Sequence, residues 1–343
     1  MKKAVIITAI ITMCSLIFVI GFGVAAVAVG VPVAAGQISR LIGEDIDIPG
    51  VNVGQIIDRA FWDWDSDNYS YNFVADDSTS KTLDMTNVQK VEIKVDAARV
   101  EILPTESNTA TVTVETSSAL GKRSLKVEAS GSTATIESKL LTEKITGFST
   151  INRTKVSIKL PKKQYAEVLV KLSAGDLTIQ DTTCDKLELK LSAGNTTIKN
   201  ATAEKMIIDC DAGNVDVKTA GVTDVDIDVD AGNVDLRDVK GKTLNVSVNA
   251  GNASMTGNSL FTNQIDGKVD MGNIDLKLSK DIGFTLKYES DMGSFLNQFD
   301  GKTSMTTSGN GSNNFMSRKG TLEYLDGACA VNLKINMGNI TIK

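Results

Sequence analysis

Apolar and polar residues alternate along most of the chain from about residue 91 onwards, in short runs that each predict a β-strand with one buried face. Seven of these runs contain a glycine, with an alternating strand before it and a shorter one after it. They are LSAGDLTI (172–179), LSAGNTTI (191–198), CDAGNVDV (210–217), VDAGNVDL (229–236), VNAGNASM (248–255), VDMGNIDL (269–276) and INMGNITI (335–342). Successive glycines from Gly175 to Gly251 are 19 residues apart, and the step to Gly272 is 21. A fixed period of this length is the signature of a repeat architecture.

The glycine of each run marks a predicted corner between two strands. Around Gly232, apolar residues alternate up to Ala231 and resume at Val234 only after a three-residue step. A turn or bulge at that step lets both strands present apolar side chains to one interior. Glycine reaches positive φ without cost, and a following Asn or Asp tolerates the left-handed region. We therefore predict structural corners at Gly175, Gly194, Gly213, Gly232, Gly251, Gly272, Gly338, Asn195, Asn214, Asn233, Asn252, Asn273 and Asn339.

Stacking of these corners predicts an all-β fold in the form of a β-solenoid with repeats of about 19 residues. Equivalent asparagines would lie about 4.8 Å apart and form a ladder along the axis. The regular repeats cover 166–302 and 331–343, and the last strand is expected to cap the final rung. Residues 303–320 are rich in Ser, Thr, Asn and Gly and are expected to form an exposed loop. An antiparallel β-sandwich is the alternative, although it requires neither the constant step nor the same residue at each corner.

The region before the array contains a degenerate first copy, VEIKVDAARVEI (91–102), which matches the later phrase but lacks its glycine. Four further alternating runs also lack the glycine: ATVTVE (110–115), SLKVEA (124–129), TATIES (133–138) and KVSIKL (155–160). We expect these runs to belong to the same β-structure and to close its N-terminal end, which gives a β-repeat domain over residues 83–343.

The N-terminus predicts a membrane anchor. Residues 4–36 follow Lys2 and Lys3 and carry no charged side chain. This uncharged, apolar run is long enough to span a bilayer. Lysines on the short N-terminal side predict a cytoplasmic N-terminus and an extracytoplasmic remainder. The predicted organisation is a cytoplasmic N-terminus and transmembrane helix over 1–36, then a linker or cap over 37–82. A cleaved signal peptide, and hence a secreted protein, is the alternative.

Composition narrows the classes of function. The chain has no histidine, which removes the commonest general base and the commonest transition-metal ligand. A net charge of -6 argues against a nucleic-acid partner. The cysteines show no paired spacing, so neither a zinc site nor a disulfide framework is expected, although one bridge among Cys184, Cys210 and Cys329 stays open. No cofactor is expected.

Aspartates gather between residues 209 and 238 and form the densest group of ionisable side chains. Asp211, Asp230 and Asp270 are candidate ligands for calcium, which takes six to eight oxygens. Outward strand positions are also where solubilising charges ordinarily lie, and the spacing differs from the nonapeptide of calcium-binding β-rolls. Paired carboxylates can also cleave glycosides, but nothing in the spacing singles out a catalytic pair. We therefore expect no catalytic residues and no enzyme.

The N-terminal anchor, the VEIKVDAARVEI opening and the AGN and MGN corners together resemble the bacterial putative-adhesin family of β-strand-repeat proteins, which includes the LiaG-like cell-envelope proteins. The resemblance covers residues 83–343, and Ser294 departs from it at a late corner. It implies an envelope or surface protein and brings no catalytic residue.

On this basis we expect a membrane-anchored extracytoplasmic protein that acts as a non-catalytic adhesion, scaffolding or envelope-stress sensing module. Its expected partners are the membrane, through residues 4–36, and a cell-wall polymer or an envelope protein. A calcium-dependent surface binding protein and a carbohydrate-active enzyme are the alternatives.

Overall fold

The structure is a computed structural model of the chain, and it describes residue 75 and residues 77–116, 123–140, 154–308 and 317–343. The predicted anchor over 1–36 lies outside the described residues, as does the predicted linker up to residue 74. Among the residues described, no helix is long and apolar enough to cross a membrane. Residues 73–343 group into one compact unit.

Every regular element in the described part of the chain is a β-strand, which confirms the all-β prediction. The N-terminal strands are β1 (Asp77–Asp84), β2 (Lys90–Ala97), β3 (Arg99–Thr105), β4 (Thr109–Thr116), β5 (Arg123–Ser130), β6 (Thr133–Leu140) and β7 (Thr154–Pro161). The central strands are β8 (Gln164–Ala174), β9 (Leu177–Gln180), β10 (Thr183–Ala193), β11 (Thr196–Lys199), β12 (Thr202–Ala212), β13 (Val215–Ala231), β14 (Val234–Ala250), β15 (Ala253–Thr256) and β16 (Leu260–Leu276). The C-terminal strands are β17 (Phe284–Met292), β18 (Phe295–Asn297), β19 (Lys302–Ser308), β20 (Ser317–Tyr324) and β21 (Cys329–Ile342).

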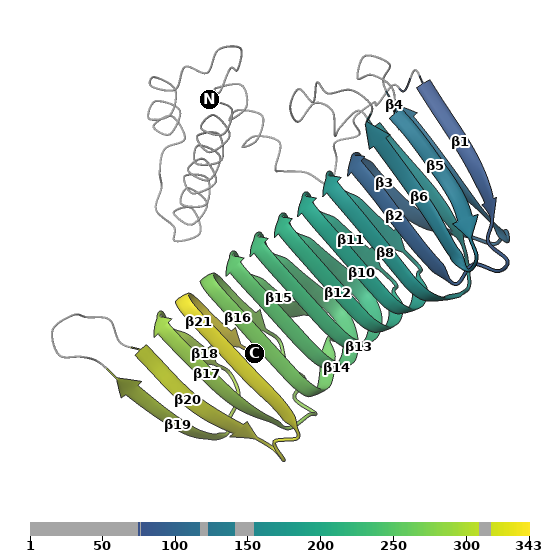
Figure 1. Cartoon of the computed structure of the whole chain (residues 1–343). Coiled ribbons are helices and arrows are strands. Elements are labelled where there is room, and N and C mark those ends of the chain that lie inside the picture. The colour runs from purple at the N-terminus through teal and green to yellow at the C-terminus, as the bar shows by residue number, and fades with distance from the viewer. Residues whose placement is uncertain (1–74, 76, 117–122, 141–153, 309–316) are drawn as a thin grey trace, which may run out of the picture. The chain divides into compact units, whose positions relative to one another are not determined.

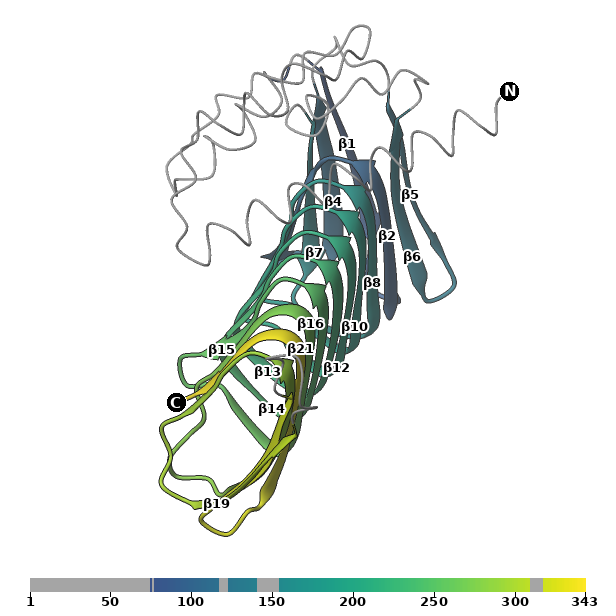
Figure 2. The same cartoon turned by 90° about the vertical axis from the view of Figure 1, so that its left-hand side faces the viewer.

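The strands of this unit stack into a solenoid with two faces (Figure 1). The long-strand face has the order β5–β6–β2–β8–β10–β12–β13–β14–β16–β21–β17–β20–β19. The short-strand face has the order β1–β4–β7–β3–β9–β11–β13–β14–β15–β16–β21–β18. Figure 2 shows the chain passing over one edge from the first face to the second in successive arches.

The β-solenoid prediction is confirmed by this pairing, and the antiparallel sandwich is wrong. All pairs from β6 to β17 on the long-strand face are parallel, with one register shift between β14 and β16, and antiparallel pairs occur only at the ends of the described stack. The core lies between the faces, because alternate residues of each strand point inwards. In β13, for example, Val225, Ile227 and Val229 are fully buried whereas the aspartates between them are exposed.

The glycine corner joins the long-strand face to the short-strand face in every regular rung. Gly232 has a φ of 151°, and a Cβ at this position would lie 1.7 Å from the carbonyl oxygen of Gly213 in the preceding rung. No L side chain fits that approach, so glycine is required both for its conformation and for its size. The other predicted corner glycines also have positive φ: Gly175, Gly194, Gly213, Gly251, Gly272 and Gly338.

A second corner, on the opposite edge of each rung, is a feature that our sequence analysis missed. It is made by Asp181, Asn200, Thr219 and Asp238, which have φ between 49° and 57°, and by Gly257 at 68°. These residues are 19 apart, like the glycines. Asp and Asn tolerate the left-handed region, so their recurrence at a fixed step was the available signal.

The C-terminal strand does not cap the last rung, and that prediction is wrong. β21 lies between β16 and β17 and pairs in parallel with both. The end of the stack is instead formed by β17, β18, β20 and β19. Rings from this end pack together, with centroids 5.0 Å apart for Phe284 and Phe299 and 4.8 Å apart for Phe299 and Tyr324. These bulky side chains differ from the aliphatic core of the inner rungs, which suits them to the end of the stack.

The predicted loop over 303–320 is wrong in its outer parts. β19 and β20 form an antiparallel pair with Lys302 opposite Glu323 and Ser308 opposite Ser317, and residues 309–316 lie outside the described residues. Polar composition suggested a loop here, but threonine also favours strands when a neighbouring strand is available. The three cysteines that left a bridge open, Cys184, Cys210 and Cys329, are free buried thiols.

Candidate functional site

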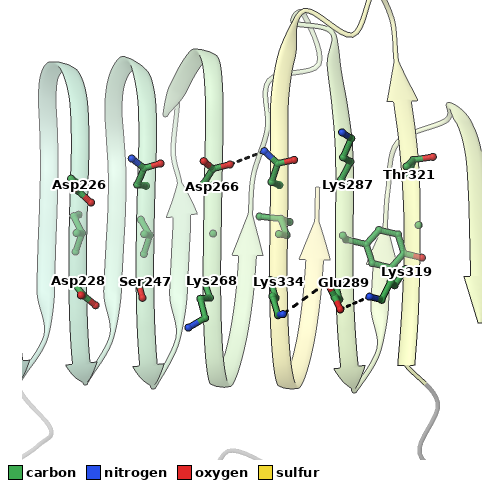
Figure 3. Close-up of a pocket in the computed structure, with 18 of the residues that line it drawn as sticks. Asp226, Asp228, Ser247, Asp266, Lys268, Lys287, Glu289, Lys319, Thr321 and Lys334 are labelled. Carbon is green, nitrogen blue, oxygen red and sulfur yellow. Dashed lines mark hydrogen bonds and ion pairs between the residues drawn. The ribbon is translucent and has the colours of Figure 1, made fainter. Parts of the chain in front are cut away.

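Outward side chains of the long-strand face stack in columns that run along the solenoid axis. Parallel strands in register place equivalent residues about 4.8 Å apart, so every column repeats at that spacing. Two neighbouring columns flank a groove near the C-terminal end of the stack (Figure 3). The first column is Asp226, Asn245, Asp266, Asn332, Lys287 and Thr321. The second column is Asp228, Ser247, Lys268, Lys334, Glu289 and Lys319.

The groove has a volume of about 740 Å³, its two columns cross six strands from β13 to β20, and Ser304 of β19 lines its end. Five intervals between strands give it a length of about 24 Å. Between the columns lie residues whose side chains point into the core, including Ile227, Val246 and Leu333. The groove is therefore a long, shallow channel with walls of polar side chains and a floor of strand backbone.

Charge changes sign along the groove. Asp226 and Asp228 are at its β13 end, whereas Lys268, Lys287, Lys319 and Lys334 lie on the strands towards its other end. We call the part of the groove on β16, β21, β17 and β20 the basic half. It contains four lysines and two carboxylates, those of Asp266 and Glu289.

Ion pairs occupy part of the basic half. The Glu289 carboxylate lies 2.6 Å from Lys319 and 4.0 Å from Lys334. The hydrogen bond from Lys319 lowers the pKa of Glu289, because it favours the charged form of this carboxylate. Lys287 has no ion-pair partner among the described residues and is exposed. Its ammonium is available to a ligand.

Amide side chains fix several carboxylates across neighbouring rungs. Asn332 donates to Asp266 at 2.7 Å in the first column. Asn249 donates to Asp230 at 2.7 Å, and Asn336 donates to Asp270 at 3.0 Å, in the column next to the corner. These bonds orient the carboxylates of Asp230, Asp266 and Asp270 along the axis.

The structure does not bring the three calcium candidates together. Asp211 and Asp230 occupy adjacent rungs, but Asn249 separates Asp230 from Asp270. Within the described parts of the chain, no group of three or more His, Cys, Asp or Glu residues could hold a metal ion.

The corner asparagines bond to one another in an unbroken ladder. The side-chain oxygen of Asn214 accepts from the backbone N–H of Asn233 at 3.0 Å and from its side-chain amide at 2.9 Å. The same two bonds recur at Asn195, Asn233, Asn252 and Asn273. The ladder starts with Asn195 donating to Asp176 and ends at Ser294, whose hydroxyl donates to Asn339 at 2.6 Å. The corner residues thus hold the rungs together.

The groove lysines are residues that the sequence analysis did not single out. Lys287, Lys319 and Lys334 come from three strands, and the position of β21 between β16 and β17 brings Lys334 into the same groove as the other two. Each is an outward lysine on an alternating strand, which in one sequence is indistinguishable from ordinary surface decoration.

Comparison with known proteins identifies the architecture. A family model described as Toastrack DUF4097 matches residues 88–343. No curated protein sequence matches the chain.

Solved structures that are similar to this chain include the following three. One is a putative cell adhesion protein from Clostridium sporogenes, with 17% identity, coverage of 78% of this chain and 98% of that chain, and a TM-score of 0.27. A putative adhesin from Parabacteroides distasonis has 15% identity, coverage of 78% and 97%, and a TM-score of 0.36. A putative adhesin from Bacteroides fragilis has 12% identity, coverage of 78% and 98%, and a TM-score of 0.38.

Proposed function

Because the chain belongs to the Toastrack DUF4097 family, we propose that it is a non-catalytic surface protein whose long-strand face binds an extended partner along the solenoid axis. The observation that supports this proposal most directly is the groove between the two columns. It is about 24 Å long by strand spacing, shallow, and lined by polar side chains at a constant repeat. Sites for small molecules are usually enclosed, whereas this groove is open along its length and follows the strand repeat, which suits a polymer.

The chemistry of the basic half indicates the kind of polymer. Four lysines line it, and Lys287 lacks a counter-charge among the described residues. An anionic chain lying along the groove would meet ammonium groups on successive rungs, so several weak contacts would add up along its length. An anionic cell-wall polymer is therefore the partner that we propose.

In this proposal residues 4–36 anchor the protein in the cytoplasmic membrane with the N-terminus inside. The support is the charge-free run after Lys2 and Lys3, which is long enough to span a bilayer. The β-domain then lies outside the membrane, where it can bind the wall and act as an adhesion or scaffolding element. Envelope-stress sensing would follow if occupancy of the groove changed with the state of the wall.

The binding experiment uses the full chain in lipid nanodiscs, sedimented with purified cell-wall sacculi. One set of sacculi keeps its anionic polymers and the other has been stripped of them. We expect the parent protein to sediment with the first set, and the Lys287→Gln, Lys334→Gln double variant to sediment much less. Binding should fall with added salt, because the contacts are between exposed charges.

Lys205→Gln is the matched control, because Lys205 is an exposed lysine on the same face, in β12, outside the groove. It should sediment like the parent. Equal sedimentation of the parent with both sets of sacculi, or equal loss in the control and the double variant, would contradict the proposal. Protease treatment of intact protoplasts tests the location separately, since only an outward β-domain is digested.

A further inference from the structure

Three methionines occupy consecutive rungs at the residue before the corner glycine. Met271 of β16 pairs with Met337 of β21, and Met337 pairs in turn with Met292 of β17. Their order in space, 271–337–292, differs from their order in sequence because β21 lies between β16 and β17 (Figure 1). At the same position the five rungs before them have alanine: Ala174, Ala193, Ala212, Ala231 and Ala250. We call the three residues the methionine ladder.

The ladder does not serve to fill the core. Met271 is 43% exposed, Met337 is 40% exposed and Met292 is half-buried, whereas Met85, Met206 and Met255 are fully buried. Alanine occupies the equivalent position in five other rungs, so the fold of a rung does not require a long side chain here. What methionine adds at this edge is a thioether sulfur that solvent can reach.

Hydrogen-bonded ladders on both sides fix the backbone of these rungs. On one side Asn336 donates to Asp270 at 3.0 Å, and on the other Asn339 donates to Asn273 at 3.1 Å. The corners themselves are in close contact, since a Cβ on Gly338 would lie 1.5 Å from the carbonyl oxygen of Gly272. The three methionine backbones are therefore held at the strand spacing of about 4.8 Å.

We propose that Met271, Met337 and Met292 form a binding site for one copper(I) ion. Thioethers are soft ligands that select copper(I), whereas hard cations such as calcium take oxygen. A zinc–thiolate bond is about 2.3 Å long, and a copper–thioether bond of similar length is close to half of the rung spacing, so sulfurs on neighbouring rungs can reach one ion between them. The third sulfur can converge on it because methionine has three rotatable bonds. The site is separate from the groove and does not depend on the function proposed for it.

Acidic side chains flank the ladder, and each interacts with a lysine, Asp270 with Lys268 and Asp291 with Lys319. Asp270 and Asp291 immediately precede Met271 and Met292. Asp270 already pairs with Lys268 at 3.3 Å and accepts from Asn336, so we assign it a role in the local potential and not as a ligand.

The experiment measures copper(I) binding by the full chain in detergent, without oxygen, in competition with the chromophoric chelator bicinchoninate. Met337→Leu removes the central sulfur but keeps a side chain of similar volume and polarity. Outer-shell partners of metal sites are typically worth about 10–100-fold in affinity, so loss of a direct ligand should weaken binding at least about tenfold. Met255→Leu, which changes a buried methionine of β15, should bind like the parent.

A rescue variant separates the ladder from other sulfur in the chain, including the cysteines, which all these variants retain. Met292→Leu should weaken binding, and adding Ala250→Met should restore it, because residues 250, 271 and 337 then form three consecutive methionines. X-ray absorption of the copper-loaded parent should show a shell of sulfur.

Two results would overturn the proposal. If Met337→Leu binds copper(I) as tightly as the parent, the ladder is not the site and its exposure reflects an apolar contact. If Met292→Leu weakens binding and Ala250→Met does not restore it, stacking of three thioethers is not what the ion recognises.

Discussion

Replacement of Gly232 by alanine tests the physical basis of the solenoid. The added Cβ would lie 1.7 Å from the carbonyl oxygen of Gly213, and contacts of real Cβ atoms stay above 3.0 Å. The two rungs must therefore separate by about 1.3 Å (3.0 minus 1.7) at this corner. Two bonds between those rungs are then at risk, from Gly213 N to Ala231 O at 2.8 Å and from Asn233 N to the Asn214 side chain at 3.0 Å.

Gly232→Ala should lower the free energy of unfolding for two reasons, backbone strain at residue 232 and the loss of hydrogen bonds between rungs. A non-glycine residue at a φ of 151° costs about 1–3 kcal/mol. Each lost hydrogen bond adds about 1 kcal/mol. We therefore expect a loss of about 3–5 kcal/mol in the free energy of unfolding. Contacts in repeat proteins are mainly between neighbours, so the loss should centre on the rungs of β12, β13 and β14.

Two other glycines provide matched controls. Gly131 has a φ of 59° with nothing within 4 Å of an added Cβ, so Gly131→Ala should cost only the backbone strain, about 1–2 kcal/mol. Gly221, in the same strand as Ala231, has open space and ordinary φ, so Gly221→Ala should be neutral or stabilise by about 0.4–1 kcal/mol.

The assay is urea unfolding of the three variants, followed by circular dichroism, with hydrogen exchange to locate the change. The expected order of stability is Gly221→Ala, then Gly131→Ala, then Gly232→Ala. A Gly232→Ala variant that loses no more stability than Gly131→Ala would refute the close stacking of the corners, because strain in φ alone would then account for the loss.

Three further predictions concern the ladder, the ion pairs and the thiols. Asn233→Ala removes three inter-rung hydrogen bonds at an exposed edge and should lower the free energy of unfolding by about 1–2 kcal/mol, measured by urea unfolding. The hydrogen bond from Lys186 lowers the pKa of Glu188 below its ordinary 4.5, so its stabilising effect is complete above pH 4.5 and is lost as pH falls through the lower, folded-state pKa. The urea midpoint of Glu188→Gln should accordingly differ from the parent's at pH 6, and the difference should shrink as the pH is lowered below 4.5. Burial raises the pKa of Cys184 to about 12 and that of Cys210 to about 11, so both thiols should resist iodoacetamide at pH 8 until the protein unfolds, and rapid labelling of the folded protein would contradict their burial.

The regular rungs were predictable because their determinants are local. Alternation up to Ala231 and its shift at Val234 require a corner, and only glycine fits the positive φ that the corner imposes. The second corner could have been found in the same way, since Asp181 and Asn200 recur at the same step as the glycines. It was missed because Asp and Asn on alternating strands are equally typical of ordinary exposed positions.

The position of β21 could not be predicted from the sequence. Backbone hydrogen bonds between parallel strands are the same for any pair with matching alternation, so the pattern of 331–343 fits the end of the stack as well as its interior. The position of β21 depends on side-chain packing at the C-terminal end of the stack. There the rings of Phe284 in β17, Tyr324 in β20 and Phe299 after β18 form a terminal cluster. The remaining gap between β16 and β17 is then closed by β21.

The sequence by itself determined the 19-residue period, the inward face of each strand and the glycine corners, because side-chain alternation and backbone sterics act within one rung. The tertiary structure alone decided which rungs are neighbours. That choice places Lys334 beside Glu289 in the groove and Met337 between Met271 and Met292 at the corner. Both candidate sites depend on contacts between residues distant in the chain, and such contacts follow from the order in which the rungs stack.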